Sequence, residues 1–300
     1  MLEPKPLFKE RLLKLLENEE DYNAFIEISR KEPVASLRCN TLKIQPEELK
    51  QRLENKGWKI KQPFKNYLEI MIVESNLLPG ELGKSIEHLL GYYYIQEISS
   101  MMPMLALQPK PNDILLDLAA SPGSKTTQAA AMMQNTGTII ANDKAVDRIK
   151  ILASNLERCG CTNIIVTKND GVQLCEKLKK TGMKFDKILV DAPCSGEGTL
   201  RSSPKTFLMW NLGMIEKLSR LQRRLAASAM KILKDGGEMI YSTCTHSPEE
   251  NELVLNFLKE NFCIEIEKIE LPIKCRPGLN KWKDKSLDNE IKNACRIYPQ

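Results

Sequence analysis

The sequence has 300 residues and a net charge of +5, and 42% of its residues are hydrophobic but only 6% aromatic. A chain of this length can bury a full core and form one large domain together with a small one. It has no apolar run of the roughly 20 residues that a membrane-spanning helix needs, and its highly charged start is unlike a signal or transit peptide. We therefore expect a soluble, cytoplasmic protein with no membrane association.

Nine cysteines are spread irregularly through the chain. An odd number of cysteines without a secretion signal argues against a disulfide framework. The pair formed by Cys159 and Cys161 has no second Cys or His pair at the spacing of a zinc site. No metal is therefore expected.

The positive charge is unevenly distributed. Residues 1–110 carry equal numbers of acidic and basic side chains, so the whole excess lies in residues 111–300. Basic side chains cluster there in two places, at Arg220, Arg223 and Arg224 and at Lys281, Lys283 and Lys285. Such clusters attract phosphates, although many of them are only solvated surface.

The first hundred residues predict a small α+β accessory domain. Apolar periodicity indicates a mixture of helices and strands. The helices are expected over 7–16, 21–28 and 46–54, and the strands over 35–40, 58–61 and 68–73. The stretch from Arg38 to Lys43 is either an RNA-facing edge or a structural strand end. A short apolar helix over 101–107 follows, and prolines after it mark a boundary. We predict an accessory, RNA-binding domain over 1–108 and a second domain over 109–300.

From residue 111 onward, strands alternate with helices. Strands are predicted over 114–118, 138–141, 163–167, 187–190, 238–241 and 264–269, and helices over 125–133, 144–158, 215–233 and 248–260. This alternation predicts an α/β fold with a doubly wound, mostly parallel sheet. Ligands bind such sheets at the carboxyl ends of the strands.

The first of these strands runs into the sequence D-L-A-A-S-P-G-S-K-T, residues 117–126. Small residues let the backbone approach a ligand, and the helix N-terminus that follows favours an anionic group. The loop matches neither G-x-G-x-x-G nor the Walker motif. The next two strands end at Asp143 and Asp170, which can accept hydrogen bonds from a ribose and an adenine amine or can cap helices. A ribose and an amine-bearing base without a pyrophosphate loop predict S-adenosylmethionine.

Two later strands each end close to a cysteine. Residues 188–190 lead into D-A-P-C-S-G-E-G-T, which contains Cys194, and residues 238–241 lead into S-T-C-T-H-S-P-E-E-N, which contains Cys244. One cysteine at a strand end is usually structural, but two in the same position indicate reactive thiols. His88 and His246 are not expected to act as catalysts, and His246 is interpreted as a surface neighbour of the site.

These motifs together resemble the Nop/Sun family of RNA cytosine-5 methyltransferases. The segments R-C-N-T-L-K and I-Q-E-I-S-S-M also resemble motifs of that family, so the resemblance covers residues 38–299. It implies that the methyl donor is held by Ala119, Ala120, Ser121, Pro122, Gly123, Ser124, Lys125, Asp143, Arg148 and Asp170. It also implies that Asp191 borders donor and target base, that Cys244 is the nucleophile, and that Cys194 serves release.

The sequence departs from the family in two places. Ser124 stands where the family usually has a second glycine before the lysine, which leaves the loop plausible. Family members usually continue beyond Pro299 into another strand rich in glycine and phenylalanine. Either the sequence is cut short or its sheet lacks the usual antiparallel strand.

The chemistry explains these residue types independently of the family. Carbon 5 of cytosine is a poor nucleophile until a thiolate adds to carbon 6, and the adduct must later be expelled with help from a second group. Asp191 can hydrogen-bond the ring nitrogen and the amine that distinguish cytosine from uracil, and Lys125 can orient Asp191. A helix beginning after Pro248 can lower the pKa of Cys244.

The favoured hypothesis is an RNA cytosine-5 methyltransferase that acts on tRNA, with ribosomal RNA as the alternative substrate. A DNA cytosine-5 methyltransferase would use the proline-adjacent cysteine as nucleophile. The Thr243–Cys244 element and the absence of a separate E-N-V motif argue against this hypothesis. A third hypothesis is an RNA-binding assembly factor that keeps the fold without turnover. A monomer is expected.

Overall fold

The computed structural model describes residues 4–300. The chain divides into two compact units. Unit 2 contains residues 34–191 and 228–241, and unit 1 contains the residues up to Pro33 together with 192–227 and 242–300. This grouping differs from the predicted boundary after residue 108, and that domain division stays a prediction. Within residues 4–300, no helix is both long and apolar enough to cross a membrane.

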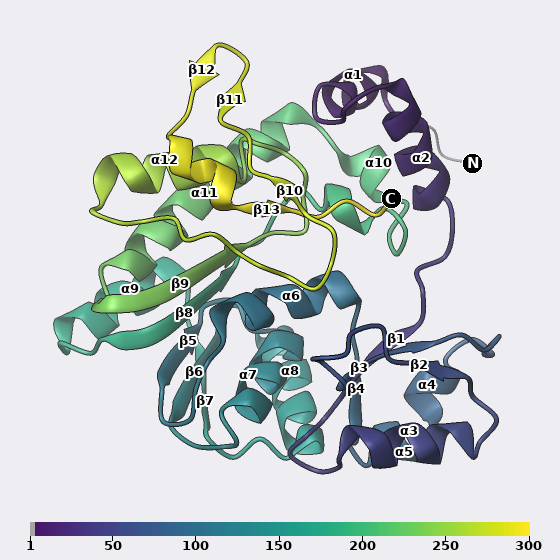
Figure 1. The fold of residues 1–300 in the computed structure, drawn as a ribbon. Helices are drawn as coiled ribbons and strands as arrows, with labels where there is room; N and C mark the ends of the chain where they lie inside the picture. The colour runs from purple at the N-terminus through teal and green to yellow at the C-terminus, as the bar shows by residue number, and fades with distance from the viewer. Residues whose placement is uncertain (1–3) are drawn as a thin grey trace. The chain divides into compact units, whose positions relative to one another are not determined.

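Unit 2 begins with a four-stranded antiparallel sheet in the order β2-β3-β1-β4 (Figure 1). Its strands are β1 (Ser36–Cys39), β2 (Ile60–Lys61), β3 (Ile70–Val73) and β4 (Tyr93–Ile95). Helices α3 (Pro46–Glu54), α4 (Glu81–Lys84) and α5 (Ile86–Leu89) accompany it. Leu49 and Leu53 of α3 are fully buried with Leu37 and Met71 of the sheet. The sequence prediction missed β4, because the prediction treated residues 92–100 as a lead into the next helix.

A five-stranded sheet in the order β7-β6-β5-β8-β9 forms the rest of unit 2. Its strands are β5 (Ile114–Asp117), β6 (Thr138–Asp143), β7 (Ile164–Lys168), β8 (Phe185–Asp191) and β9 (Leu233–Ser242). The pairs β5/β6, β6/β7 and β5/β8 are parallel. Helices α6 (Ile98–Leu107), α7 (Ser124–Met132), α8 (Val146–Cys159) and α9 (Gly171–Lys180) belong to the same unit. The predicted doubly wound α/β sheet is confirmed.

Small and apolar side chains of the helices pack on this sheet and form its core. Ala129 and Ala130 of α7 pack on Leu115 and Ile139 of the sheet without any exposure, and Leu152 of α8 packs on Ala141. Met101, Met102 and Met104, which lie in the apolar helix predicted over 101–107, are buried in α6. Helix α8 ends at Cys159, and Gly160 caps it with a left-handed backbone whose φ is 71°.

Unit 1 contains helices from both ends of the chain (Figure 1). They are α1 (Pro6–Leu13), α2 (Glu19–Ser29), the 3-10 turn η1 (Glu197–Thr199), α10 (Thr206–Met209), α12 (Glu252–Asn261) and the 3-10 turn η2 (Asn289–Asn293). The long helix α11 (Leu212–Met230) runs mostly through this unit. Short strands β10 (Arg276–Pro277) and β13 (Cys295–Arg296) pair, as do β11 (Lys281–Trp282) and β12 (Lys285–Ser286).

One predicted element of the C-terminal region is present with a later start, and another is wrong. The helix expected from Pro248 begins only at Glu252, with Asn251 before it. The strand expected over 264–269 has no regular structure. Side chains satisfy the backbone of this segment in place of a neighbouring strand. Ile266 N–H donates to Glu290 Oε2 at 2.9 Å, and Asn293 Nδ2 donates to the Ile266 carbonyl at 2.7 Å.

Candidate active site

The loop between β5 and α7 has a backbone that only small residues allow. Gly123 has a φ of 105°, and a Cβ there would lie 3.1 Å from Leu152 Cδ1. The loop is also held from behind, because Ala120 N–H donates to the Asn142 carbonyl at 2.7 Å. Residues 119–123 of the predicted cradle therefore form a turn at the carboxyl end of β5, and its last two residues, Ser124 and Lys125, begin helix α7.

Asp143 and Arg148 connect this loop to the end of β6. Arg148 Nε donates to Asp143 Oδ2 at 3.0 Å, and Arg148 Nη2 donates to the Ser121 carbonyl at 2.6 Å. Asp143 Oδ1 accepts from Ala145 N–H at 3.1 Å. Each carboxylate oxygen still has acceptor capacity for another donor.

Asp170 caps helix α9. Its Oδ1 atom accepts from Val172 N–H at 3.1 Å and from Gln173 N–H at 3.3 Å. This is the capping alternative that the sequence left open. A contact between Asp170 and an adenine amine stays a prediction.

Lys125 and Asp191 form an ion pair in unit 2. Lys125 Nζ donates to Asp191 Oδ2 at 2.6 Å. The side chain of Lys125 is 12% exposed and that of Asp191 34% exposed, so both lie at the margin of the core. The sequence predicted that Lys125 orients Asp191, and this contact has the geometry that such a role requires.

Asp117, at the end of β5, is a buried carboxyl group beside this loop. Burial raises its pKa to about 7, although Thr126 Oγ1 donates to Asp117 Oδ2 at 2.7 Å. In the part of the chain that the structure describes, Asp117 Oδ1 is buried and has no hydrogen-bond partner. Asp117 is the first residue of the motif at 117–126, but no role was predicted for it.

Arg38 connects the accessory sheet to helix α7. Its guanidinium group is buried and donates to the Ser124 carbonyl at 2.8 Å and to Thr127 Oγ1 at 2.8 Å. Asn40 is buried as well, and its Nδ2 donates to the Gly91 carbonyl at 2.8 Å and the Cys159 carbonyl at 2.7 Å. Of the two interpretations of residues 38–43, the structural one therefore holds for Arg38 and Asn40, because neither side chain is available to RNA.

In unit 1, the two predicted cysteines are in contact. Cys194 Sγ and Cys244 Sγ lie 3.0 Å apart, and Cys244 N–H donates to Cys194 Sγ at 3.3 Å. Cys244 is exposed, whereas Cys194 is half-buried. The hydrogen bond with Cys244, together with burial, raises the pKa of Cys194 well above its usual range. Both effects favour the protonated form of Cys194.

Backbone hydrogen bonds hold the two cysteine segments together. Ala192 N–H donates to the Ser242 carbonyl at 2.9 Å, and Gly198 N–H donates to the Cys244 carbonyl at 2.8 Å. A Cβ at residue 198 would lie 3.0 Å from that carbonyl oxygen. Glycine at this position allows the close approach that keeps Cys194 beside Cys244.

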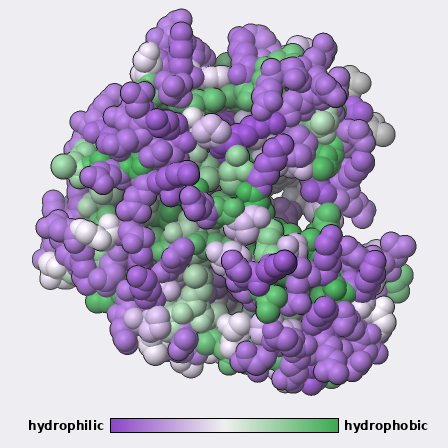
Figure 2. All heavy atoms as spheres, viewed as in Figure 1, coloured by the Kyte–Doolittle hydropathy of each residue, from purple (hydrophilic) through white to green (hydrophobic). Residues whose placement is uncertain are grey.

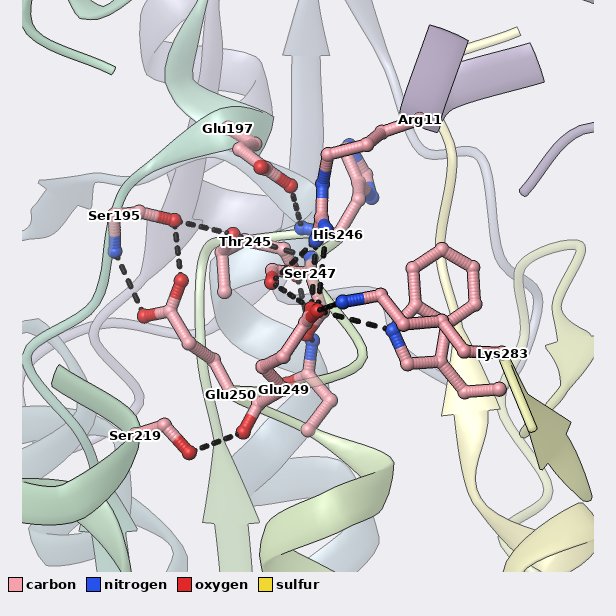
Figure 3. Close-up of polar contacts among 12 residues, drawn as sticks. Arg11, Ser195, Glu197, Ser219, Thr245, His246, Ser247, Glu249, Glu250 and Lys283 are labelled. Atoms are coloured by element: carbon pink, nitrogen blue, oxygen red, sulfur yellow. Dashed lines mark hydrogen bonds and ion pairs between the residues drawn. The ribbon is translucent and has the colours of Figure 1, made fainter. Parts of the chain in front are cut away.

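The residues that follow the cysteines meet at a buried carboxylate (Figure 3). Ser195 Oγ lies 2.7 Å from Thr245 Oγ1. Glu250 has no exposed surface, and its Oε2 accepts from Ser195 N–H at 3.0 Å and from Gln222 Nε2 at 2.9 Å. Its other oxygen accepts from the Ser195 hydroxyl group. Glu250 therefore fixes the segment of Cys194 to that of Cys244.

His246 was wrongly interpreted as a surface residue. It is 7% exposed, stacks on Tyr298 with ring centroids 4.7 Å apart, and meets Phe25 edge-on. Burial, with the charge of Arg296, lowers its pKa to about 3. His246 is thus a neutral core residue, and Glu197 Oε2 accepts from its backbone N–H at 3.1 Å.

Glu249 is the centre of a second cluster on the same segment (Figure 3). It pairs with Arg11 at 2.6 Å and with Lys283 at 3.2 Å, and Trp282 Nε1 donates to it at 3.0 Å. Glu197, Glu249 and Glu250 lie within the cysteine motifs that the sequence singled out. The sequence could have indicated these three residues, because each is a carboxylate in a motif and had no assigned role. It could not have indicated their hydrogen-bond partners, because those come from distant segments.

The parallel sheet, the loop after its first strand and the acids at its strand ends define the class I, Rossmann-like methyltransferase fold. A crystal structure of a methyltransferase homolog protein from Pyrococcus horikoshii superposes with a TM-score of 0.79 at 34% identity, covering 98% of this chain and 94% of that one. NSun6 from Pyrococcus horikoshii with SFG superposes with a TM-score of 0.80 at 27% identity and 91% coverage of both chains.

Sequence comparison then gives the family. The family model described as 16S rRNA methyltransferase RsmB/F matches residues 104–300, and that of the N-terminal domain of 16S rRNA methyltransferase RsmF matches residues 5–98. The chain belongs to this RsmB/F methyltransferase family, which confirms the Nop/Sun resemblance.

Curated relatives carry two substrate names. The tRNA (cytosine(49)-C(5))-methyltransferase of Pyrococcus abyssi is 42% identical over 265 residues, which cover 88% of this chain and 83% of that protein. Ribosomal RNA small subunit methyltransferase F of Photobacterium profundum is 42% identical over 298 residues, covering 98% of this chain and 60% of that protein. The protein of the same name from Vibrio campbellii is 41% identical, and the match covers 55% of its length. The chain therefore spans little more than half of these ribosomal RNA relatives.

Proposed function

We propose that this protein transfers a methyl group from S-adenosylmethionine to carbon 5 of a cytosine in RNA, through a covalent adduct between Cys244 and carbon 6 of the base. The observation that carries the proposal is the thiol pair. An exposed Cys244 lies 3.0 Å from a Cys194 whose pKa is raised, which provides one nucleophile and one proton donor at the same place.

The residues of unit 2 fit S-adenosylmethionine. Gly123 lets the backbone come close to a ligand, Asp117 keeps a buried oxygen without a partner in residues 4–300, and Asp143 retains acceptor capacity for ribose hydroxyls. The residues proposed to hold the cofactor are Ala119, Ala120, Ser121, Pro122, Gly123, Ser124, Lys125, Asp143, Arg148, Asp170 and Asp191. When bound, the cofactor supplies an electrophilic methyl group.

The roles of the chain's own groups follow from the chemistry. The Cys244 thiolate adds to carbon 6 and makes carbon 5 nucleophilic. The Asp191 carboxylate, oriented by Lys125, accepts hydrogen bonds from the exocyclic amine of cytosine and from its ring nitrogen in the protonated form. After carbon 5 has been methylated, a water molecule acting as base takes its proton, the electrons of that C–H bond restore the double bond between carbon 5 and carbon 6, and the bond between Cys244 and carbon 6 breaks. The Cys194 thiol can donate a hydrogen bond to the departing thiolate.

We propose tRNA as the substrate, with small-subunit ribosomal RNA as the alternative. The support for tRNA is the 42% identity to a tRNA methyltransferase of which the chain matches 83%, whereas the match covers a smaller share of the ribosomal RNA relatives. The test is transfer of a labelled methyl group to unmodified tRNA and to small-subunit ribosomal RNA, followed by mapping of 5-methylcytidine. We expect a defined cytosine in tRNA. A product only in ribosomal RNA would overturn the substrate, and no product in either RNA would overturn the activity.

A further inference from the structure

A basic groove in unit 1 is not part of the site described above. It has a volume of about 500 Å³ and lies between helix α1 and the hairpin β11–β12. Its lining is Arg11, Lys14, Lys281, Trp282, Lys283 and Asp284. Hydrophilic side chains cover this hairpin, which lies at the top of the view in Figure 2. Four of the six lining residues are cationic and one is anionic.

The floor of the groove is rigid. Trp282 is 6% exposed, and the Arg11 guanidinium carbon lies 5.4 Å from its ring centroid. Trp282 Nε1 and Arg11 both donate to Glu249, which fixes them to the segment that follows Cys244. The hairpin closes with a hydrogen bond from Leu287 N–H to the Asn280 carbonyl at 2.9 Å. A rigid floor lowers the entropic cost of holding a ligand.

The basic side chains at the rim of the groove outnumber the acidic side chains that pair with them. Glu249 is shared by Arg11 and Lys283, and Glu10 pairs with Lys14 at 2.6 Å. Lys281 and Lys285 are exposed on the same hairpin, and neither forms an ion pair within residues 4–300. Lysines held in place on a hairpin can bind a polyanion whose singly charged groups repeat along its length. The buried face of Trp282 leaves no aromatic surface for stacking a base.

We infer that this groove and the hairpin beside it bind the phosphodiester backbone of the RNA substrate, with Lys281 and Lys283 of the groove lining and Lys285 of the neighbouring strand β12 as the contacts. The inference rests on the proposed function, because it assigns the groove to the same RNA. Glu249 belongs to the segment of Cys244, so backbone bound in the groove is held by the unit that carries the nucleophile. Base recognition is not assigned to this groove, because lysine contacts to phosphate carry no sequence information.

The test compares two double variants of the full chain that each remove two positive charges from unit 1. K281A/K285A changes the hairpin, and K31A/K268A removes two exposed lysines elsewhere in that unit. The probe is unmodified tRNA, and its dissociation constant is measured between 50 and 200 mM salt, roughly the range over which phosphate contacts dominate. We expect K281A/K285A to bind about ten-fold more weakly and to lose about one unit of salt slope per lysine, while K31A/K268A binds as the unchanged protein does.

Equal tRNA binding by the two double variants would overturn the inference. So would weaker binding with an unchanged salt slope, because it would indicate damage to the fold instead of lost phosphate contacts. Binding is measured without turnover, so absence of methyl transfer would overturn the proposed function and leave the groove test readable. Acidic polyglutamate is the second probe. If it binds the unchanged protein more tightly than tRNA does and loses that affinity in K281A/K285A, the groove is a site for acidic protein, and the assignment to RNA fails.

Discussion

Cys194 Sγ and Cys244 Sγ lie 3.0 Å apart, although 50 residues separate the two cysteines in the sequence. They follow β8 and β9, which are neighbours in the sheet. The exposed thiol is Cys244, and the one with the raised pKa is Cys194. This asymmetry within one pair is the basis of the proposed division of labour.

The first prediction separates the roles of the two thiols. Cys244→Ala should abolish the covalent protein–RNA adduct, because no thiolate remains to add to carbon 6. Cys194→Ala should let the adduct persist, because release loses its proton donor. Denaturing electrophoresis with labelled tRNA measures both. The reverse pattern, with an adduct in the Cys244 variant and none in the Cys194 variant, would exchange the two assignments.

The second prediction concerns oxidation of the same pair. Hydrogen peroxide should convert the two thiols into one disulfide, with loss of two hydrogens from sulfur and formation of two waters, because the sulfurs are already in contact. Methyl transfer should fall at least ten-fold and return with dithiothreitol. Thiol counting before and after treatment measures the change. Cys263, which is also exposed, provides a control, since Cys263→Ser should not alter the response.

The third prediction concerns Glu250. Glu250→Ala leaves the buried Ser195 N–H without its acceptor, which costs about 1–3 kcal/mol, and it should lower turnover by misplacing Cys194. Glu250→Gln keeps one oxygen for Ser195 N–H and Gln222, and its amide can donate to Ser195 Oγ, so activity should largely return. The control is Glu260→Ala at the exposed end of α12. Equal turnover in Glu250→Ala and the control would contradict a positioning role.

The fourth prediction concerns Arg38. Arg38→Lys cannot reach both the Ser124 carbonyl and Thr127 Oγ1, so the start of α7 loses buried donors. We expect the KM for S-adenosylmethionine to rise several-fold and the thermal midpoint to fall. Steady-state kinetics and thermal unfolding measure the two effects. Lys43, which donates to two backbone carbonyls from an exposed position, serves as the control through Lys43→Ala. An unchanged KM in Arg38→Lys would show that the cofactor loop does not depend on this contact.

The fifth prediction concerns stability at low pH. The pKa of His246 is about 3 in the folded protein and 6.5 in the unfolded chain. Between these pH values the unfolded chain therefore binds a proton that the folded chain does not. Stability should therefore fall as the pH drops below 6.5, by up to about 1.4 kcal/mol per pH unit from this residue. His246→Phe should lose that dependence. Denaturant midpoints at pH 7.5 and pH 5 measure it, and the same slope in both proteins would refute this cause.

Several features followed from the sequence alone. The parallel sheet was predictable because each strand and helix has its own local periodicity, and the strand ends were marked by motifs at residues 117–126, 191–199 and 242–251. The contact between Lys125 and Asp191 was predictable as well, since both residues follow neighbouring strands of such a sheet. The roles of these residues in catalysis stay predictions.

Only the tertiary structure decided how the motifs are held. Ser195 and Gln222 meet at Glu250 from two separate segments, and no local pattern encodes such a meeting. His246 is buried because Phe25 and Tyr298 reach it from opposite ends of the chain. The Arg38 side chain points inward because it donates hydrogen bonds to a carbonyl and a hydroxyl group of α7. Local sequence sets which residues can form an element, whereas burial and hydrogen-bond satisfaction between distant segments decide what each side chain contacts.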